Sequence, residues 1–167
     1  HDKNGRPVPG NWHIYPEQAA AGLWTTPTDL CRLAIEIQKT LSGKQGVLST
    51  DLAKEMLSPQ LVDYQGLGLG IGGKNDSLYF RHGGSNKGYK CTLFAFAGLG
   101  KGAVIMTNGD PGSELINEIM RSLSAEYGWN RYRPAVKSIA DLSPDEMGKL
   151  TGTYFFAENP FLVLEVS

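Results

Sequence analysis

The sequence predicts an α+β fold in which helices flank an antiparallel β-sheet. Two stretches of helical periodicity come first, four short strand-like runs follow them, and a third helical stretch comes next. Elements in this order pack as a layer of helices on a sheet. At 167 residues, of which 41% are hydrophobic, the chain is long enough to bury an ordinary core.

Residues 25–41 form the first predicted helix. Thr26 is a plausible N-cap and Pro27 suits the first helical turn. One apolar stripe follows at helical spacing, made of Leu30, Leu33, Ala34, Ile37 and Leu41. A shorter helix is expected to begin at Ser49 or Thr50 and to run through Met56.

Four short β-prone runs then follow one another closely. They cover residues 67–73, 77–82, 90–96 and 102–108, and glycine-rich or Asn-Asp segments separate them. This spacing predicts an antiparallel meander with hairpin connections. A third helix is expected next, with Leu115, Ile116, Ile119, Met120 and Leu123 on its buried face.

The end of the chain has a different character. Residues 131–137 read as a linker, and Ser143 with Glu146 forms a capping-box pattern that opens a short helix. Two strand-like runs, 151–156 and 161–166, follow it. We therefore predict one domain over residues 1–133 and the beginning of a β module over 134–167.

Several classes of function are disfavoured by composition. A formal net charge of −1 offers no basic surface for nucleic acid, and no apolar run reaches the roughly 18–20 residues of a membrane span. His1, His13 and His82 lack metal-ligand spacing, so we expect no metal. Cys31 and Cys91 are expected to be small buried residues in preference to a disulfide pair.

No nucleotide cofactor is expected either. The glycine-rich run 66–74 ends in Gly73-Lys74, but Asn75 stands where a phosphate-binding loop requires serine or threonine. We predict that the protein uses no cofactor.

Residues 81–90, RHGGSNKGYK, carry the candidate chemistry. The segment is either a strand end followed by a flexible turn, or a site in which His82 orients a reacting group and the Ser85 N–H points at an oxyanion. Ser85 is not in a G-x-S-x-G elbow, and the sequence contains no Ser-x-x-Lys. A possible oxyanion donor is present, therefore, without a nucleophile.

Three blocks together resemble a known family. AAAGLWTTPTDLCRLAIEI, GLGLGI and RHGGSNKGYKCTLFAFAGLGKGAVIMTNGD resemble, in this order, the C-terminal half of the catalytic domain of serine β-lactamases and penicillin-binding proteins. The branch with class C β-lactamases, D-aminopeptidases and related esterases is the most similar. His82-Gly83-Gly84 matches the third motif of that family, Lys-Thr-Gly or His-x-Gly.

The resemblance implies roles for particular residues. His82 takes the place of the cation of the third motif, and Ser85 contributes its backbone N–H to the oxyanion hole. Gly83, Gly84 and Asn108 would contact substrate, and Ala21 would lie on the opposite wall of the cleft. The substrate would be an ester, a D-amino-acid peptide or a β-lactam, in a periplasmic or extracellular protein.

The chain also departs from the family pattern. The Ser-x-x-Lys and Tyr-x-Asn motifs, which precede this region in the family, are absent, so we expect the chain to be the C-terminal portion of a hydrolase and inactive alone. Histidine in place of lysine weakens the positive field at neutral pH, which favours a neutral or D-amino-acid substrate at least as well as one carrying a carboxylate.

Other interpretations stay open at this point. The chain could be a non-catalytic peptide- or cell-wall-binding module that retains the fold, or a plain α+β domain with a glycine-rich hairpin. A half-domain should expose surfaces that its missing half would cover, so dimerisation through them is a further hypothesis.

Overall fold

The computed structural model describes residues 1–134, 137, 140–156 and 159–166. Two compact units make up the chain, His1–Arg133 and Pro134–Ser167. No helix in the described residues is long and apolar enough to cross a membrane.

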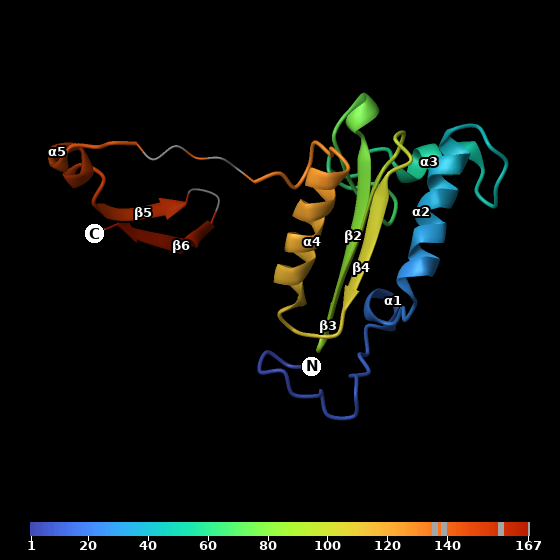
Figure 1. The fold of residues 1–167 in the computed structure, drawn as a ribbon, viewed down its shortest axis with the longest axis horizontal. Coiled ribbons are helices and arrows are strands. Elements are labelled where there is room, and N and C mark those ends of the chain that lie inside the picture. The colour runs from blue at the N-terminus through green and yellow to red at the C-terminus, as the bar shows by residue number, and fades with distance from the viewer. Residues whose placement is uncertain (135–136, 138–139, 157–158, 167) are drawn as a thin grey trace. The chain divides into compact units, whose positions relative to one another are not determined.

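The first unit is built on a four-stranded antiparallel sheet (Figure 1). Its strands follow one another in space as they do in sequence: β1 (Gly70–Gly72), β2 (Tyr79–Asn86), β3 (Tyr89–Phe96) and β4 (Gly102–Thr107). A short 3₁₀ helix, η1 (Asn75–Ser77), connects β1 to β2. With its flanking helices, this sheet confirms the predicted α+β fold and its meander.

Four α-helices belong to the first unit: α1 (Gln18–Ala21), α2 (Pro27–Leu41), α3 (Thr50–Met56) and α4 (Gly112–Glu126). The expected caps are present, since the Thr26 hydroxyl accepts from the Asp29 N–H and the Ser49 hydroxyl accepts from the Leu52 N–H, each at 3.2 Å. These caps satisfy N–H groups that a helix start leaves without partners.

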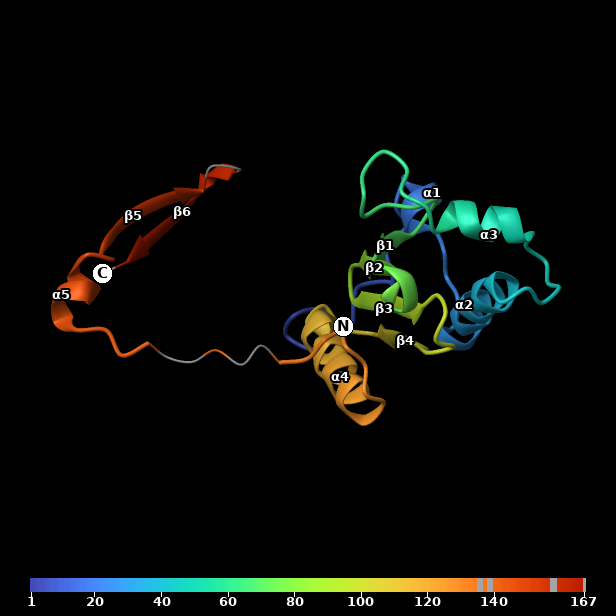
Figure 2. The same ribbon diagram turned by 90° about the horizontal axis from the view of Figure 1, so that it is seen from above.

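Two apolar layers cover the two faces of the sheet. Figures 1 and 2 show α2 and α4 on opposite sides of it. On the α2 side the buried set is Ala34, Ile37, Leu57, Leu69, Ile71, Phe80, Leu93, Ala95 and Ala97. On the α4 side it is Tyr79, Phe94, Phe96, Ile116, Met120 and Trp129. Neighbouring strand residues alternate between the two layers, as the period of two requires.

Several details differ from the sequence prediction. Only Gly70–Gly72 of the run 67–73 is a strand, and Leu33 and Leu115, expected on buried stripes, are 40% and 50% exposed. Strand β2 does not end at His82 but continues to Asn86. The turn is formed by Lys87 and Gly88, where glycine accommodates a φ of +79°. The interpretation of this segment as a strand that ends at His82 and is followed by a flexible turn is therefore wrong.

The second unit consists of α5 (Pro144–Gly148) and the antiparallel pair β5 (Gly152–Phe156) and β6 (Asn159–Val166). The predicted capping box is present: the Ser143 N–H donates to the Glu146 carboxylate at 2.9 Å, and the Ser143 hydroxyl accepts from the Glu146 N–H. Large apolar side chains of both strands are exposed, among them Tyr154, Phe155, Phe156, Leu162 and Leu164. A lone two-stranded hairpin is only marginally stable in water.

Candidate functional site

The candidate site lies on the second half of β2. Strand β1 pairs with β2 only from Tyr79 to Arg81, whereas β3 pairs with β2 along its whole length. From His82 to Asn86, β2 therefore has a partner strand on one side only within the described residues. We call the other side of this segment, residues 82–86, the open edge of β2.

The register determines which backbone groups face the open edge. Opposite residues in an antiparallel pair alternate between those that exchange two hydrogen bonds and those that exchange none. The Phe96 N–H donates to the Lys101 carbonyl at 2.9 Å, so the even-numbered residues of β3 bond toward β4 and the odd-numbered ones toward β2.

The β3 residues that bond toward β2 are paired with His82, Gly84 and Asn86. The N–H groups of Gly83 and Ser85 consequently point away from β3, toward the open edge. Tyr79 and Arg81 are odd-numbered like Gly83 and Ser85, and their backbone groups likewise point away from β3, toward β1. The backbone thus presents two aligned donors along an edge that no described strand covers.

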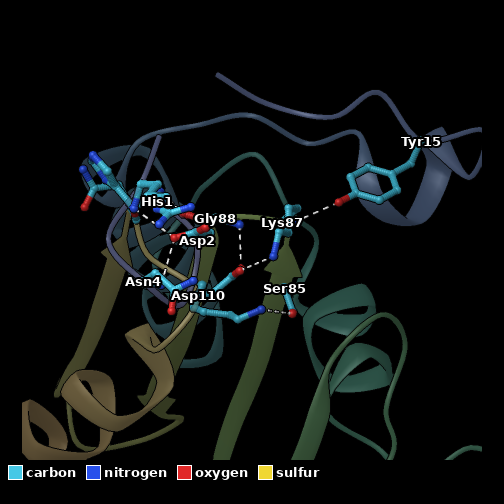
Figure 3. A network of polar contacts seen from close by, with 11 residues as sticks. His1, Asp2, Asn4, Tyr15, Ser85, Lys87, Gly88 and Asp110 are labelled. Carbon is cyan, nitrogen blue, oxygen red and sulfur yellow. Dashed lines mark hydrogen bonds and ion pairs between the residues drawn. The ribbon is translucent and has the colours of Figure 1, made fainter. Parts of the chain in front are cut away.

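The side chains of His82 and Ser85 lie on opposite faces of the sheet. His82 alternates with Phe80, which is buried on the α2 side, and Ser85 alternates with Tyr79, which is buried on the α4 side. The His82 side chain is exposed and has no hydrogen-bond partner among the described residues. The Ser85 hydroxyl accepts from Lys90 Nζ at 2.7 Å (Figure 3). The imidazole and this hydroxyl therefore do not act as a pair.

The two glycines of the motif differ in what surrounds them. A Cβ at Gly84 would stand 2.5 Å from Cys91 Sγ, whereas a Cβ at Gly83 would meet only the Cys91 carbonyl oxygen at 3.7 Å. Packing therefore requires glycine at position 84 and tolerates a larger residue at position 83. Burial raises the pKa of the Cys91 thiol, against the opposing effect of the Gly84 backbone hydrogen bond.

Segment 15–24 lies beside the hairpin end of β2. Asn86 Nδ2 donates to the Ala21 carbonyl at 3.0 Å, and the Lys87 N–H donates to the Tyr15 hydroxyl at 2.9 Å. The ring of Trp24 packs edge-on against Tyr89, with 5.0 Å between centroids. The structure therefore brings Ala21 to the end of the open edge.

Asn108 is not brought to the same place. It follows Thr107, the last residue of β4, and β3 lies between β4 and β2. Its carbonyl accepts from the His1 amine at 2.6 Å. The predicted site residue Asn108 is thus separated from His82 and Ser85 by a strand.

Sequence reasoning missed Asp110. Its carboxylate binds Lys87 Nζ at 2.5 Å and accepts from the Gly88 N–H at 2.7 Å, which ties the β2–β3 turn to the chain after β4 (Figure 3). The Lys87 contact, with help from the Gly88 N–H, holds the pKa of Asp110 below its usual range, and Asp110 in turn raises the pKa of Lys87. No spacing in the sequence links positions 87 and 110.

Lys90 was also missed as a partner of Ser85. The sequence spacing of five residues does not predict the contact, because only the hairpin register places the two residues opposite each other.

Within the described residues no group of three or more His, Cys, Asp or Glu is arranged to hold a metal. Two recesses of that part of the chain, one beside α2 and one along residues 43–50, are lined by neither His82 nor Ser85.

Comparison with known proteins identifies the family to which the chain belongs. The family model described as Beta-lactamase matches residues 1–125, so the chain belongs to the β-lactamase family. This confirms the superfamily of serine hydrolases that the motifs predicted.

Two solved structures are similar to the chain, "Crystal structure of SurE" and "Crystal structure of SurE with D-Leu". Each is 25% identical with a TM-score of 0.52, and each match covers 85% of this chain. The chain spans about one third of the length of these relatives, since 33% and 34% of their chains are covered. No curated protein matches.

Proposed function

We propose that the chain is the C-terminal portion of a serine acyl-transfer hydrolase and forms one wall of its active site. The observation that carries the proposal is the direction of the Ser85 N–H, which faces the open edge of β2 three residues after His82. A fixed backbone donor of this kind stabilises the oxyanion that develops on a substrate carbonyl, because it needs no reorientation during the reaction.

The other residues of the edge have complementary roles in this proposal. The substrate carbonyl lies beside Gly83, where the missing side chain leaves room for close approach. On the α2 side, His82 helps to hold the substrate and the hydrogen-bond network around the general base. Ala21 lies at the Asn86 end of the open edge and forms the opposite wall of the cleft. Asn108 stays a proposed substrate contact, and β3 lies between it and the open edge.

The nucleophile of the proposed reaction is a serine outside the 167 residues, because the sequence contains no Ser-x-x-Lys. That serine attacks the substrate carbonyl, the amine or alcohol leaves, and water then hydrolyses the acyl ester. The proposed substrates are esters, D-amino-acid peptides or β-lactams, and the proposed location is periplasmic or extracellular. A relative whose structure was determined with D-Leu supports a D-amino-acid group in the substrate.

Two measurements test the proposal. The purified chain should hydrolyse neither nitrocefin nor p-nitrophenyl acetate; turnover by a homogeneous sample would show that the nucleophile lies within the chain. In ¹H–¹⁵N NMR spectra, N-acetyl-D-leucine amide should shift the amides of Gly83 and Ser85. Shifts confined to other regions would contradict the placement of the site at the open edge.

A second candidate, a non-catalytic peptide-binding module, rests on the same missing motif. The sequence that precedes these residues in the gene distinguishes the two. A Ser-x-x-Lys followed by a Tyr-x-Asn or similar base motif supports the hydrolase, and the absence of both supports the binding module.

A further inference from the structure

We propose that Arg81 and Arg131 form a binding site for a phosphate group on the α4 side of strand β1. The site lies on the part of β2 that is paired with β1, outside the open edge, and it does not depend on the proposed hydrolase function. It gives a role to the glycine-rich run 66–74, which that function leaves without one.

Two glycines of β1 make room for side chains of β2. Gly70 is the register partner of Arg81 and Gly72 that of Tyr79, and partners in register share a face of the sheet. A Cβ at Gly70 would stand 3.3 Å from Arg81 Cγ and 3.5 Å from Arg81 Nε. A Cβ at Gly72 would stand 2.7 Å from Tyr79 Cζ. Tyr79 and Arg81 therefore lie across β1, in the space that the two glycines leave free.

Segment 131–133 brings a second guanidinium to the same face of the sheet. Arg131 Cζ lies 4.6 Å from the centre of the Tyr79 ring, and Arg131 Nη2 donates to the Tyr79 hydroxyl at 3.2 Å. Tyr79 and Arg81 are two residues apart on one strand, which separates their backbone positions by about 7 Å. The guanidinium of Arg131 is thus held over the neighbour of Arg81.

Tyr132 is close to both guanidiniums. Its ring packs edge-on against Phe94 with 5.2 Å between centroids, and its φ is +58°, a left-handed value that is uncommon outside glycine. Burial raises the pKa of Tyr132, whereas Arg81 and Arg131 both act to lower it, so both lie within electrostatic reach of its hydroxyl. Backbone strain of this kind concentrates at ligand sites and switch regions.

The two guanidiniums are not neutralised within the described residues. The two ion pairs found there lie elsewhere, on α2 and at the β2–β3 turn. Arg81 and Arg131 are exposed, and the hydrogen-bond partner of Arg131 is the neutral Tyr79 hydroxyl. Like charges held close together repel each other, and an anion bound between them removes that repulsion.

A phosphate group matches two arginines better than a carboxylate does. A guanidinium is planar, stays charged and forms two parallel hydrogen bonds with an oxyanion. A phosphate monoester carries a charge of roughly −1.5 to −2 at neutral pH and three strong acceptor oxygens, so it can engage both guanidiniums. A carboxylate has two oxygens and one charge, which a single arginine satisfies. Soluble phosphate esters and acidic phospholipids share this chemistry.

The test is an NMR titration of the ¹⁵N-labelled 167-residue chain with inorganic phosphate, with sodium chloride of equal ionic strength as the reference. Phosphate should shift the Nε–H signals of Arg81 and Arg131 and the Tyr132 amide until the site is saturated. Arg81→Gln and Arg131→Gln should each weaken binding about tenfold, because each removes charge-assisted hydrogen bonds. Arg131→Lys keeps the charge without the planar fork and should retain only part of the affinity.

Two further variants separate a site from a general effect of charge. Arg121→Gln is the matched control, because it makes the same change of charge at an exposed arginine of α4 and should leave binding unchanged. Gly70→Val changes no charge, but its side chain would occupy the space of Arg81, so it should weaken phosphate binding with both arginines present. Urea unfolding curves of all variants show whether the fold is kept.

Sedimentation with vesicles distinguishes the sources of the phosphate group. If the ligand is a lipid headgroup, phosphatidylcholine vesicles that contain phosphatidic acid should sediment the chain, and Arg81→Gln should abolish this. If the ligand is soluble, the chain should stay in the supernatant and still bind inorganic phosphate. No saturable shift beyond that of sodium chloride, together with no sedimentation, would overturn the proposal. Equal weakening by Arg121→Gln would also overturn it.

Discussion

The two halves of strand β2 differ in their strand pairing and in their exposure to solvent. From Tyr79 to Arg81 the strand is paired on both sides, and Tyr79 and Phe80 are 8% and 0% exposed. From His82 onward it is paired on one side, and His82, Gly83 and Ser85 are exposed.

This contrast shows how one strand can both build a core and leave backbone amides unpaired along its edge. The buried half fixes the register, because Phe80 fits only the α2 side and Tyr79 only the α4 side. The register then sets the direction of every amide in the exposed half. The chemistry proposed for Ser85 depends on packing several residues away.

The largest expected effect is a difference in the free energy of unfolding between variants in the two halves of β2. Phe80→Ala should lower the free energy of unfolding by about 3–5 kcal/mol, because it leaves a cavity between the sheet and α2. His82→Ala should change it by less than about 0.5 kcal/mol, since the side chain is exposed. Urea denaturation followed by circular dichroism measures both. Equal losses for the two variants would contradict the division of the strand.

A smaller effect should distinguish the two glycines. Gly84→Ala should destabilise the fold by about 1–3 kcal/mol, because the new Cβ would meet Cys91 Sγ, whereas Gly83→Ala should be nearly neutral. In a Cys91→Ala background the loss at position 84 should largely disappear. A loss that persists without the thiol would mean that something other than this contact requires glycine there.

Proline should be tolerated at position 85 but not at position 84. The Ser85 N–H bonds to no strand among the described residues, so Ser85→Pro should cost less than about 1 kcal/mol and still abolish binding of N-acetyl-D-leucine amide. Gly84→Pro removes a ladder hydrogen bond to β3 and should unfold the hairpin. Thermal unfolding and NMR titration report the two effects; full binding by Ser85→Pro would exclude its N–H as the donor.

The smallest effect concerns pH and the β2–β3 turn. The Lys87 contact lowers the pKa of Asp110 in the folded state, so the contribution of Asp110 is present above the ordinary carboxyl value of 3.8 and is lost as pH falls through the lower folded value. The Gly88 amide shift should follow this titration, with a midpoint below 3.8. Asp110→Asn should abolish the step. A midpoint at or above the ordinary value would show that the ion pair does not persist in solution.

Much of the fold could be predicted because its signals are local. The Thr26 cap, the Ser143–Glu146 capping box and the order of the four strands all depend on short-range patterns. The extent of β2 was underestimated because Gly83 and Gly84 resemble a turn locally, whereas pairing with β3 keeps them extended.

Less of the candidate site than of the fold could be predicted from the sequence. The motif around His82 could be recognised, but the contacts of Lys90 and Asp110 depend on the register of β2 with β3 and on the path of the chain after β4. Asn108 was predicted from the resemblance to the family, and only the strand order shows that β3 lies between it and β2.

Amide hydrogen exchange along β2 tests the central claim most directly. If β3 fixes the register described above, the amides of His82, Gly84 and Asn86 exchange slowly, and those of Gly83 and Ser85 exchange rapidly. Protection of the Ser85 amide equal to that of Gly84 would show that its N–H is bonded within the fold, and the proposed oxyanion donor would be lost.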